Sequence, residues 1–423
     1  MHSYHLSGSD RGVLKADLMS NYLFPFLAAV GLLTMTAFPK AGVYVGNIPV
    51  TLGYVLLMFF GSLEILYIAI NKVKTTRPVF ISLAIGFFGL AILQLSFFRI
   101  YGYRSMGNAI SIMASTLLVP GLSILSTTWF LRTLGIGNFV RTLRLSLLIV
   151  FSFGMVSFFA YNASAIVIGV PYVTTTGDDI TEVFQKHNLR GPIVKMFSTY
   201  NNGNILGLNL LLWGPMAAVG VVPSLRYALG YRAICLLTLS RSVWVGLLTY
   251  EFISAYETRS LLRVRRAFGV SIALVGTAIM VSVLIGKDPL QFLLDKDLGG
   301  RVSDFNEQIK VISTQRIAWD GESVYTAAWM AYGPLGLLGI LSVWLLPIFH
   351  AGPSLIQRTA RVSMIVYMLI AAVEGAFNLI PTQFTYWMVA SIAISDFANP
   401  RSISMTESKQ VLPLVTENQS DSS

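Results

Sequence analysis

The chain has 423 residues, of which 54% are hydrophobic and only 12% are charged, about half of the roughly 25% that is usual in soluble domains. The hydrophobic residues fall in runs of about 18 to 25, the length that crosses the core of a bilayer. This composition argues against a soluble enzyme, a nucleic-acid binder or a disulfide-rich secreted domain, and it predicts an all-α polytopic membrane protein. The formal net charge of +10 is distributed in a way that fits membrane topology better than nucleic-acid binding.

The apolar runs predict about twelve transmembrane helices in chain order. We expect them at residues 22–39, 49–70, 79–98, 109–131, 145–170, 204–222, 227–239, 243–256, 267–286, 334–350, 363–380 and 384–397. The two runs on either side of Ser240 and Arg241 are each too short for a perpendicular span. We therefore expect a helical hairpin whose polar tip lies below the membrane surface.

Basic residues concentrate in alternate loops, which predicts the orientation of the chain. Those loops contain Lys72, Lys74, Arg77, Arg132, Arg141, Arg144, Arg226, Arg232, Arg259, Arg263, Arg265, Arg266, Arg358 and Arg361. The positive-inside rule places them in the cytoplasm, together with both termini. Residues 1–400 are then a single transmembrane domain and residues 401–423 a disordered cytoplasmic tail. The first apolar run lacks a small-residue cleavage pattern, so we expect a retained helix and not a signal peptide.

The opposite side of the membrane carries two long loops, at about residues 171–203 and 287–333. Loops of this length are uncommon unless they are functional or disordered. The second loop includes an amphipathic stretch at residues 305–312, which predicts a helix lying on the outer membrane face.

Ionisable residues within or at the ends of apolar runs should face the bundle interior, because each is costly in hydrocarbon. For Glu64 and Glu374 we expect pairing with an arginine or a backbone donor, and for Glu251 a position near the cytoplasmic surface beside Arg259. Arg241 differs, because the run Ser-Arg-Ser at residues 240–242 interrupts two apolar half-spans. A guanidinium there would offer a fixed fork of donors to a phosphate or pyrophosphate.

Three segments, at residues 198–204, 236–244 and 333–339, together resemble the O-antigen polymerase and ligase superfamily (Wzy-type). Residues 236–244, Leu-Leu-Thr-Leu-Ser-Arg-Ser-Val-Trp, look like its Thr-x-Ser-Arg hairpin, and residues 198–204, Ser-Thr-Tyr-Asn-Asn-Gly-Asn, look like the Asn-rich entry to the preceding helix. Residues 333–339, Gly-Pro-Leu-Gly-Leu-Leu-Gly, are similar to the start of the helix after the large loop. The order and spacing of these segments match the superfamily from about residue 190 to residue 339.

The resemblance implies a GT-C-like fold and a polysaccharide polymerase in the bacterial inner membrane. Such an enzyme transfers a growing glycan, at the periplasmic face, from undecaprenyl pyrophosphate to a sugar of another lipid-linked repeat unit. Ligases of the superfamily carry a histidine near the end of the large loop, and the corresponding residues 320–325 contain none, which favours a polymerase. The alternatives are an O-antigen ligase of the same fold and a lipid-linked oligosaccharide flippase, although no internal repeat supports a transporter.

The resemblance and the chemistry together nominate a site. Arg241 and Glu322 are the candidate catalytic residues, with Glu322 as general base and Asp320 and Asp304 as its alternatives. The candidate ligands of the substrate pyrophosphate are Ser240, Arg190, Arg301 and Arg316. The candidate glycan contacts are Asn204, Tyr200, Trp319 and Tyr325.

No metal or other cofactor is expected, because the four histidines are scattered and Cys235 is the single cysteine. The expected partners are undecaprenyl-pyrophosphate-linked oligosaccharides and a chain-length regulator protein in the same membrane. We expect no nucleic acid.

Overall fold

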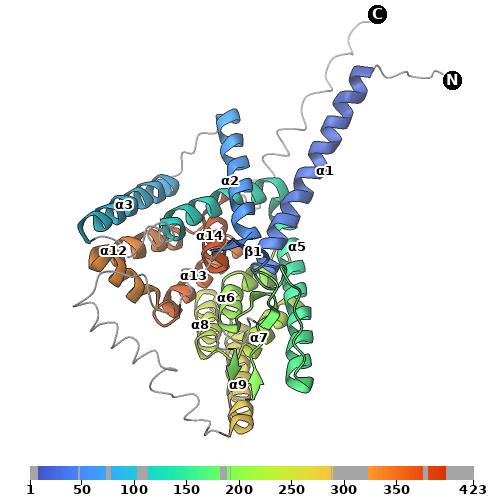
Figure 1. The fold of residues 1–423 in the computed structure, drawn as a ribbon, viewed down its shortest axis with the longest axis vertical. Helices are drawn as coiled ribbons and strands as arrows, with labels where there is room; N and C mark the ends of the chain where they lie inside the picture. The colour runs from blue at the N-terminus through green and yellow to red at the C-terminus, as the bar shows by residue number, and fades with distance from the viewer. Residues whose placement is uncertain are drawn as a thin grey trace, which may run out of the picture.

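The computed structural model describes residues 8–45, 48–72, 78–101, 113–181, 188–190, 192–286, 288, 323–374 and 380–396. This part of the chain is mostly helical (Figure 1). Four of its helices are long and apolar enough to cross a bilayer, and they lie at Leu52–Asn71, Pro78–Ser96, Ala114–Ser164 and Leu261–Ile285. A mostly helical chain with four candidate membrane-spanning helices is therefore confirmed among the described residues, and a total of about twelve spans stays a prediction.

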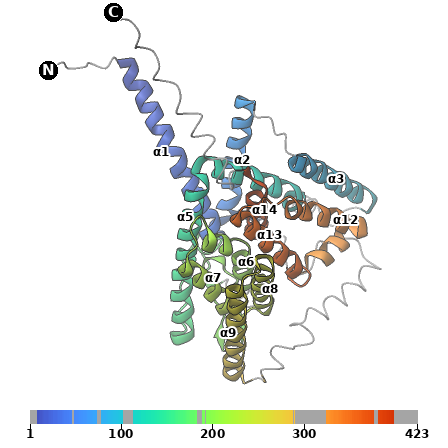
Figure 2. The same cartoon turned by 180° about the vertical axis from the view of Figure 1, so that it is seen from behind.

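The N-terminal helices form one side of the molecule. They are α1 (Gly8–Ala37), α2 (Leu52–Asn71), α3 (Pro78–Tyr101), the π-turn η1 (Ala114–Leu118) and α5 (Val119–Ser164). Helices α1 and α2 both pack on α5, whereas α3 lies beside α12 (Val324–Phe349), as the two opposite views show (Figures 1 and 2).

Helix α5 is interrupted at Gly135, where the backbone has φ 66° and ψ 160°. A glycine adopts this conformation at little cost, so the chain changes direction there while both arms stay helical. The prediction of a loop around Arg132, Arg141 and Arg144 is therefore wrong, because these residues lie on α5, and their cytoplasmic side stays a prediction. Arg132 instead reaches Glu64, with 2.8 Å between its Nη1 and Oε2 of the carboxylate, which confirms the expected pairing of Glu64 with an arginine.

The C-terminal helices form a bundle around a buried centre. They are α6 (Gly203–Val219), α7 (Leu225–Leu237), α8 (Arg241–Thr258), α9 (Leu261–Ile285), α12, α13 (Leu355–Ile370) and α14 (Ile380–Ile394). Helix α13 packs against α6, α8 and α14. Trp213, Tyr367 and Trp387 are fully buried in this centre, as expected for helices that are apolar on every face.

Two glycines let these helices approach closely. A Cβ atom at Gly207 of α6 would lie 2.4 Å from Cγ2 of Val243 on α8. A Cβ atom at Gly246 of α8 would lie 2.1 Å from Cδ1 of Ile370 on α13. At Gly207 the three nearest atoms all belong to Val243, so the close approach of α6 and α8 depends on the missing side chain there. At Gly246 the nearest atom is the end of the flexible Ile370 side chain, which can move aside.

Two predicted boundaries are wrong. Helix α13 begins at Leu355, not at residue 363, because Ser354 and Gln357 form a capping box with both reciprocal hydrogen bonds. Helix α12 begins at Val324, within the residues expected in the outer loop, whereas the predicted span at residues 334–350 agrees with the apolar helix Gly333–Phe349. Gly333 is a kink within α12, with φ 65°, directly before Pro334, a residue that cannot donate a helical hydrogen bond.

The described strands are short and form two antiparallel hairpins. Strand β1 (Gly42–Val45) pairs with β2 (Ile48–Thr51), with Gly42 opposite Thr51. Strand β3 (Leu189–Arg190) pairs with β4 (Ile193–Val194), with Arg190 opposite Ile193. The second hairpin leads the chain into the beginning of α6.

Candidate functional site

Several helix ends meet at the end of the bundle where α8 begins. The backbone N–H of Met196 donates to the carbonyl oxygen of Leu237, the last residue of α7, at 2.9 Å. The N–H of Val324, the first residue of α12, donates to the carbonyl of Ala371, just after α13, at 3.0 Å. The first bond joins the segment after β4 to the tip between α7 and α8, and the second joins the beginning of α12 to the turn after α13. A contact between Ser242 and Glu374 joins these two pairs.

The tip between α7 and α8 is a tight polar turn. Leu239 has a left-handed backbone with φ 49°, and Ser240 is extended, with φ −99° and ψ 117°, so that α8 begins at Arg241. The hydroxyls of Ser240 and Ser242 are 2.9 Å apart, and both residues are buried. The predicted turn between two helices is confirmed, and its tip is buried within the protein, whereas its depth in the membrane stays a prediction.

A carboxylate lies against this tip. Glu374, in the turn after α13, is 7% exposed, and its Oε2 accepts a hydrogen bond from the hydroxyl of Ser242. Burying a carboxylate is costly unless it is hydrogen-bonded or paired, so the contact is a specific feature of the fold. Glu374 was noticed in the sequence as a charge in an apolar run, but its contact with residue 242 joins segments 132 positions apart and leaves no local signal.

A second polar cluster surrounds the beginning of α6. The side-chain oxygen of Asn202 caps this helix by accepting from the N–H of Asn204 at 2.8 Å, and the side-chain oxygen of Asn188 accepts from the N–H of Gly203 at 3.0 Å. Nζ of Lys195 donates to the side-chain oxygen of Asn204 at 3.0 Å, although Lys195 is only 1% exposed. The positive end of the helix dipole and a buried ammonium therefore coincide, an arrangement that favours an anion.

Sequence reasoning missed Lys195. The local signal was the lysine itself, three residues before the Asn-rich segment that was singled out at residues 198–204. Arg190, a predicted pyrophosphate ligand, lies on β3, and the N–H of Lys195 donates to the carbonyl of Asn188 at 2.8 Å. The β3–β4 hairpin thus places both cations on the same short segment beside α6.

Two of the predicted glycan contacts, Tyr200 and Tyr325, contact neighbouring helices instead. Tyr200 is 1% exposed and its hydroxyl donates to the carbonyl of Thr36 on α1 at 2.7 Å. Burial raises the pKa of Tyr200, so the phenol keeps its proton, and the ring has no face open to a sugar. The hydroxyl of Tyr325 donates to the carbonyl of Met368 and ties α12 to α13. The prediction that these two rings stack on sugars is not supported by this packing.

The structure describes some of the other predicted site residues and leaves the rest outside its described ranges. Ser240, Arg241, Asn204 and Arg190 belong to the elements that meet at this end of the bundle. Outside the described residues lie Glu322, Arg301, Arg316, Trp319, Asp304 and Asp320. Val324 is two residues after Glu322 in the sequence. Its backbone hydrogen bond to Ala371 joins the beginning of α12 to a position three residues before Glu374.

Within the described ranges, no group of three or more histidines, cysteines, aspartates or glutamates is placed to hold a metal ion. Comparisons with protein-family models, curated proteins and solved structures find no match to this chain. The function is therefore argued from the geometry of the site and from the chemistry of its residues.

Proposed function

We propose that this protein is a membrane glycosyltransferase that polymerises an O-antigen or related polysaccharide at the periplasmic face of the bacterial inner membrane. Its donor is a glycan on undecaprenyl pyrophosphate, and its acceptor is a sugar hydroxyl of another lipid-linked repeat unit. The bond between the anomeric carbon and the pyrophosphate oxygen breaks. The acceptor oxygen bonds to that carbon, and its proton passes to a carboxylate.

One observation carries the proposal: a buried carboxylate contacts the Ser-Arg-Ser tip of a helical hairpin within an apolar helical bundle. Pyrophosphate is already a good leaving group, so the reaction needs cations near its charge and a base near the acceptor hydroxyl. Arg241 at the tip and Lys195 at the beginning of α6 are the cations that we assign to the pyrophosphate, with Arg190, Arg301 and Arg316 as further ligands.

Two carboxylates are candidates for the base. The resemblance nominates Glu322, and the contact with Ser242 supports Glu374. A general base must lie within hydrogen-bond reach of the proton that it takes. Glu374 meets part of this requirement, because it already accepts a hydrogen bond from a hydroxyl beside Arg241.

A ligase of the same fold would use the same chemistry with a different acceptor, and a flippase would move the lipid-linked unit without forming a bond. The test is to delete the gene in its host and compare lipopolysaccharide ladders after complementation with wild type, Arg241→Ala or Arg226→Ala. Arg226 is an exposed arginine at the beginning of α7 and provides a matched control at the opposite end of the bundle.

We expect Arg241→Ala to leave core plus one repeat unit without a ladder, at wild-type protein level, and Arg226→Ala to restore the ladder. Core without any repeat unit in the deletion strain would indicate a ligase or a flippase. A full ladder with Arg241→Ala would remove Arg241 from the site.

A further inference from the structure

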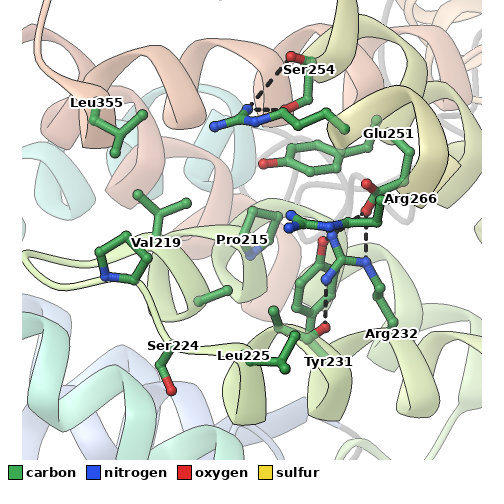
Figure 3. Close-up of a pocket in the computed structure, with 15 residues that line it drawn as sticks. Pro215, Val219, Ser224, Leu225, Tyr231, Arg232, Glu251, Ser254, Arg266 and Leu355 are labelled. Atoms are coloured by element: carbon green, nitrogen blue, oxygen red, sulfur yellow. Dashed lines mark hydrogen bonds and ion pairs between the residues drawn. The ribbon is translucent and has the colours of Figure 1, made fainter. Parts of the chain in front are cut away.

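A cavity of about 330 Å³ lies near the opposite end of the bundle from Arg241. The end of α6, the first half of α7, the second half of α8 and the beginnings of α9 and α13 enclose it (Figure 3). Glu251, in its wall, is ten positions after Arg241 on α8, about 15 Å along the helix axis. The cavity is therefore separate from the site described above.

One ion pair forms part of the cavity wall. Nη2 of Arg232 is 2.5 Å from Oε1 of Glu251, and Nε of the same guanidinium donates to this oxygen at 2.7 Å. Nη1 of Arg232 donates to the carbonyl of Ala228 at 2.8 Å. This pairing corrects the expectation that Glu251 lies beside Arg259. It also means that the charge of Arg232 is balanced.

Two further guanidiniums face the cavity, and neither is paired with a carboxylate of the described residues. Nη1 of Arg263 donates to the neutral hydroxyl of Ser254 at 2.5 Å. Arg266 lines the cavity beside Arg232 (Figure 3) and has no hydrogen-bond or ion-pair partner among the residues that the structure describes. The nearby acid Glu257 is engaged by Arg361 at 2.6 Å. The cavity therefore carries two positive charges that an anion would balance.

Much of the remaining wall is apolar and continues onto the surface. Pro215, Val219, Leu225 and Leu355 line it, and Leu225 is 67% exposed. Helix α9, one of the four helices long and apolar enough to cross a membrane, begins at Leu261, which is 78% exposed. A ligand here would meet donors on one side and an apolar surface at the membrane boundary on the other.

We propose that this cavity binds the phosphate of an anionic membrane lipid. Arg266 and Arg263 donate to the phosphate oxygens, and the acyl chains lie over Leu225 and Leu261. The volume fits a headgroup, since ligand cavities begin at about 300 Å³. The arginines around it lie on α7 and near the beginning of α9, among the basic residues for which the positive-inside rule predicts the cytoplasmic side, where anionic lipids concentrate. The inference does not depend on the proposed glycosyltransferase activity.

The test measures lipid retention by the full-length protein, purified in neutral detergent, by native mass spectrometry. Phosphatidylglycerol is compared with phosphatidylcholine in wild type, Arg266→Ala and Arg265→Ala. Arg265 is the matched control, because it is exposed on the same helix and does not line the cavity. We expect selective retention of phosphatidylglycerol, a loss of about tenfold in Arg266→Ala and no change in Arg265→Ala.

Equal losses in the two variants would overturn the proposal, because they would indicate general attraction to a basic surface. A second experiment adds glycerol 3-phosphate as a competitor of the lipid. If it displaces the lipid at concentrations similar to those at which the lipid binds, the cavity takes a free phosphate ester and the lipid assignment is wrong. Arg266→Gln, checked by its size-exclusion profile, repeats the test should Arg266→Ala aggregate, and full retention by this variant would also overturn the proposal.

Discussion

At the scale of single residues, the contact between Ser242 and Glu374 distinguishes the tip of the α7–α8 hairpin from an ordinary helix turn. The hydroxyl of Ser242 lies between that of Ser240, at 2.9 Å, and the carboxylate of Glu374. Ser242 is one residue from Arg241, so these groups fix both a cation and a carboxylate at the beginning of α8. In the proposed reaction, Ser242 is a positioning residue.

A double-mutant cycle tests this coupling. We expect Glu374→Gln to reduce polymer formation strongly, because it removes a candidate base, and Ser242→Ala to reduce it less. The double variant should be little worse than Glu374→Gln alone, with a coupling free energy of about 0.5 to 3 kcal/mol, because Ser242 acts by positioning the carboxylate that Glu374→Gln already removes. The measurement is the initial rate with purified protein, using Ser271→Ala on α9 as the control serine. Additive effects would contradict a positioning role for Ser242.

At the scale of helices, the position of α8 depends on close packing at Gly207. The atoms nearest to a Cβ at this position belong to Val243, and a β-branched side chain has little freedom to move aside. We expect Gly207→Ala to destabilise the protein by about 1 to 3 kcal/mol, which would lower the unfolding temperature in detergent.

Gly276→Ala on α9 is the matched control, since nothing lies within 4 Å of a Cβ there. It should leave the unfolding temperature unchanged or raise it, because alanine favours a helix over glycine by about 1 kcal/mol. An equal fall in both variants would show that the contact with Val243 is not what makes Gly207 necessary.

Much of the helix order could be predicted from apolar runs, and the errors have physical causes. The beginning of α13 was missed because Gln357, Arg358 and Arg361 interrupt its apolar pattern, although Ser354 and Gln357 have capping-box spacing. The bend at Gly135 was mistaken for a loop, because basic residues on a kinked helix have the same sequence pattern as a basic loop. Hydrophobic periodicity shows which faces of a helix are apolar, but it does not show whether two helical stretches form one continuous helix.

The candidate site could be predicted only where a motif marks it. The Ser-Arg-Ser run indicated the hairpin tip, and the Asn-rich segment indicated the beginning of α6. Lys195 and Glu374 could not be assigned, because their positions depend on packing between distant helices. Tyr200 was assigned to sugar binding on its residue type, whereas its contact with Thr36 on α1 places it in the core.

At the scale of the whole molecule, the two polar regions lie at opposite ends of one helical bundle, and α8 contributes to both. The hairpin tip has a buried carboxylate and nearby cations, and the other end has a basic cavity beside exposed leucines. An enzyme that draws both substrates from a bilayer needs a reaction centre at one face, and a lipid bound at the other face would hold the bundle at a fixed depth.

The central claim is that the site at the beginning of α8 forms glycosidic bonds. The most direct test incubates purified full-length protein with undecaprenyl-pyrophosphate-linked repeat units and measures polymer length together with released undecaprenyl pyrophosphate. The proposed reaction predicts one lipid released for each bond formed by wild type, and neither product from Arg241→Ala at equal protein concentration. Polymer formation by Arg241→Ala at the wild-type rate, or the absence of any product from folded wild type, would contradict the claim.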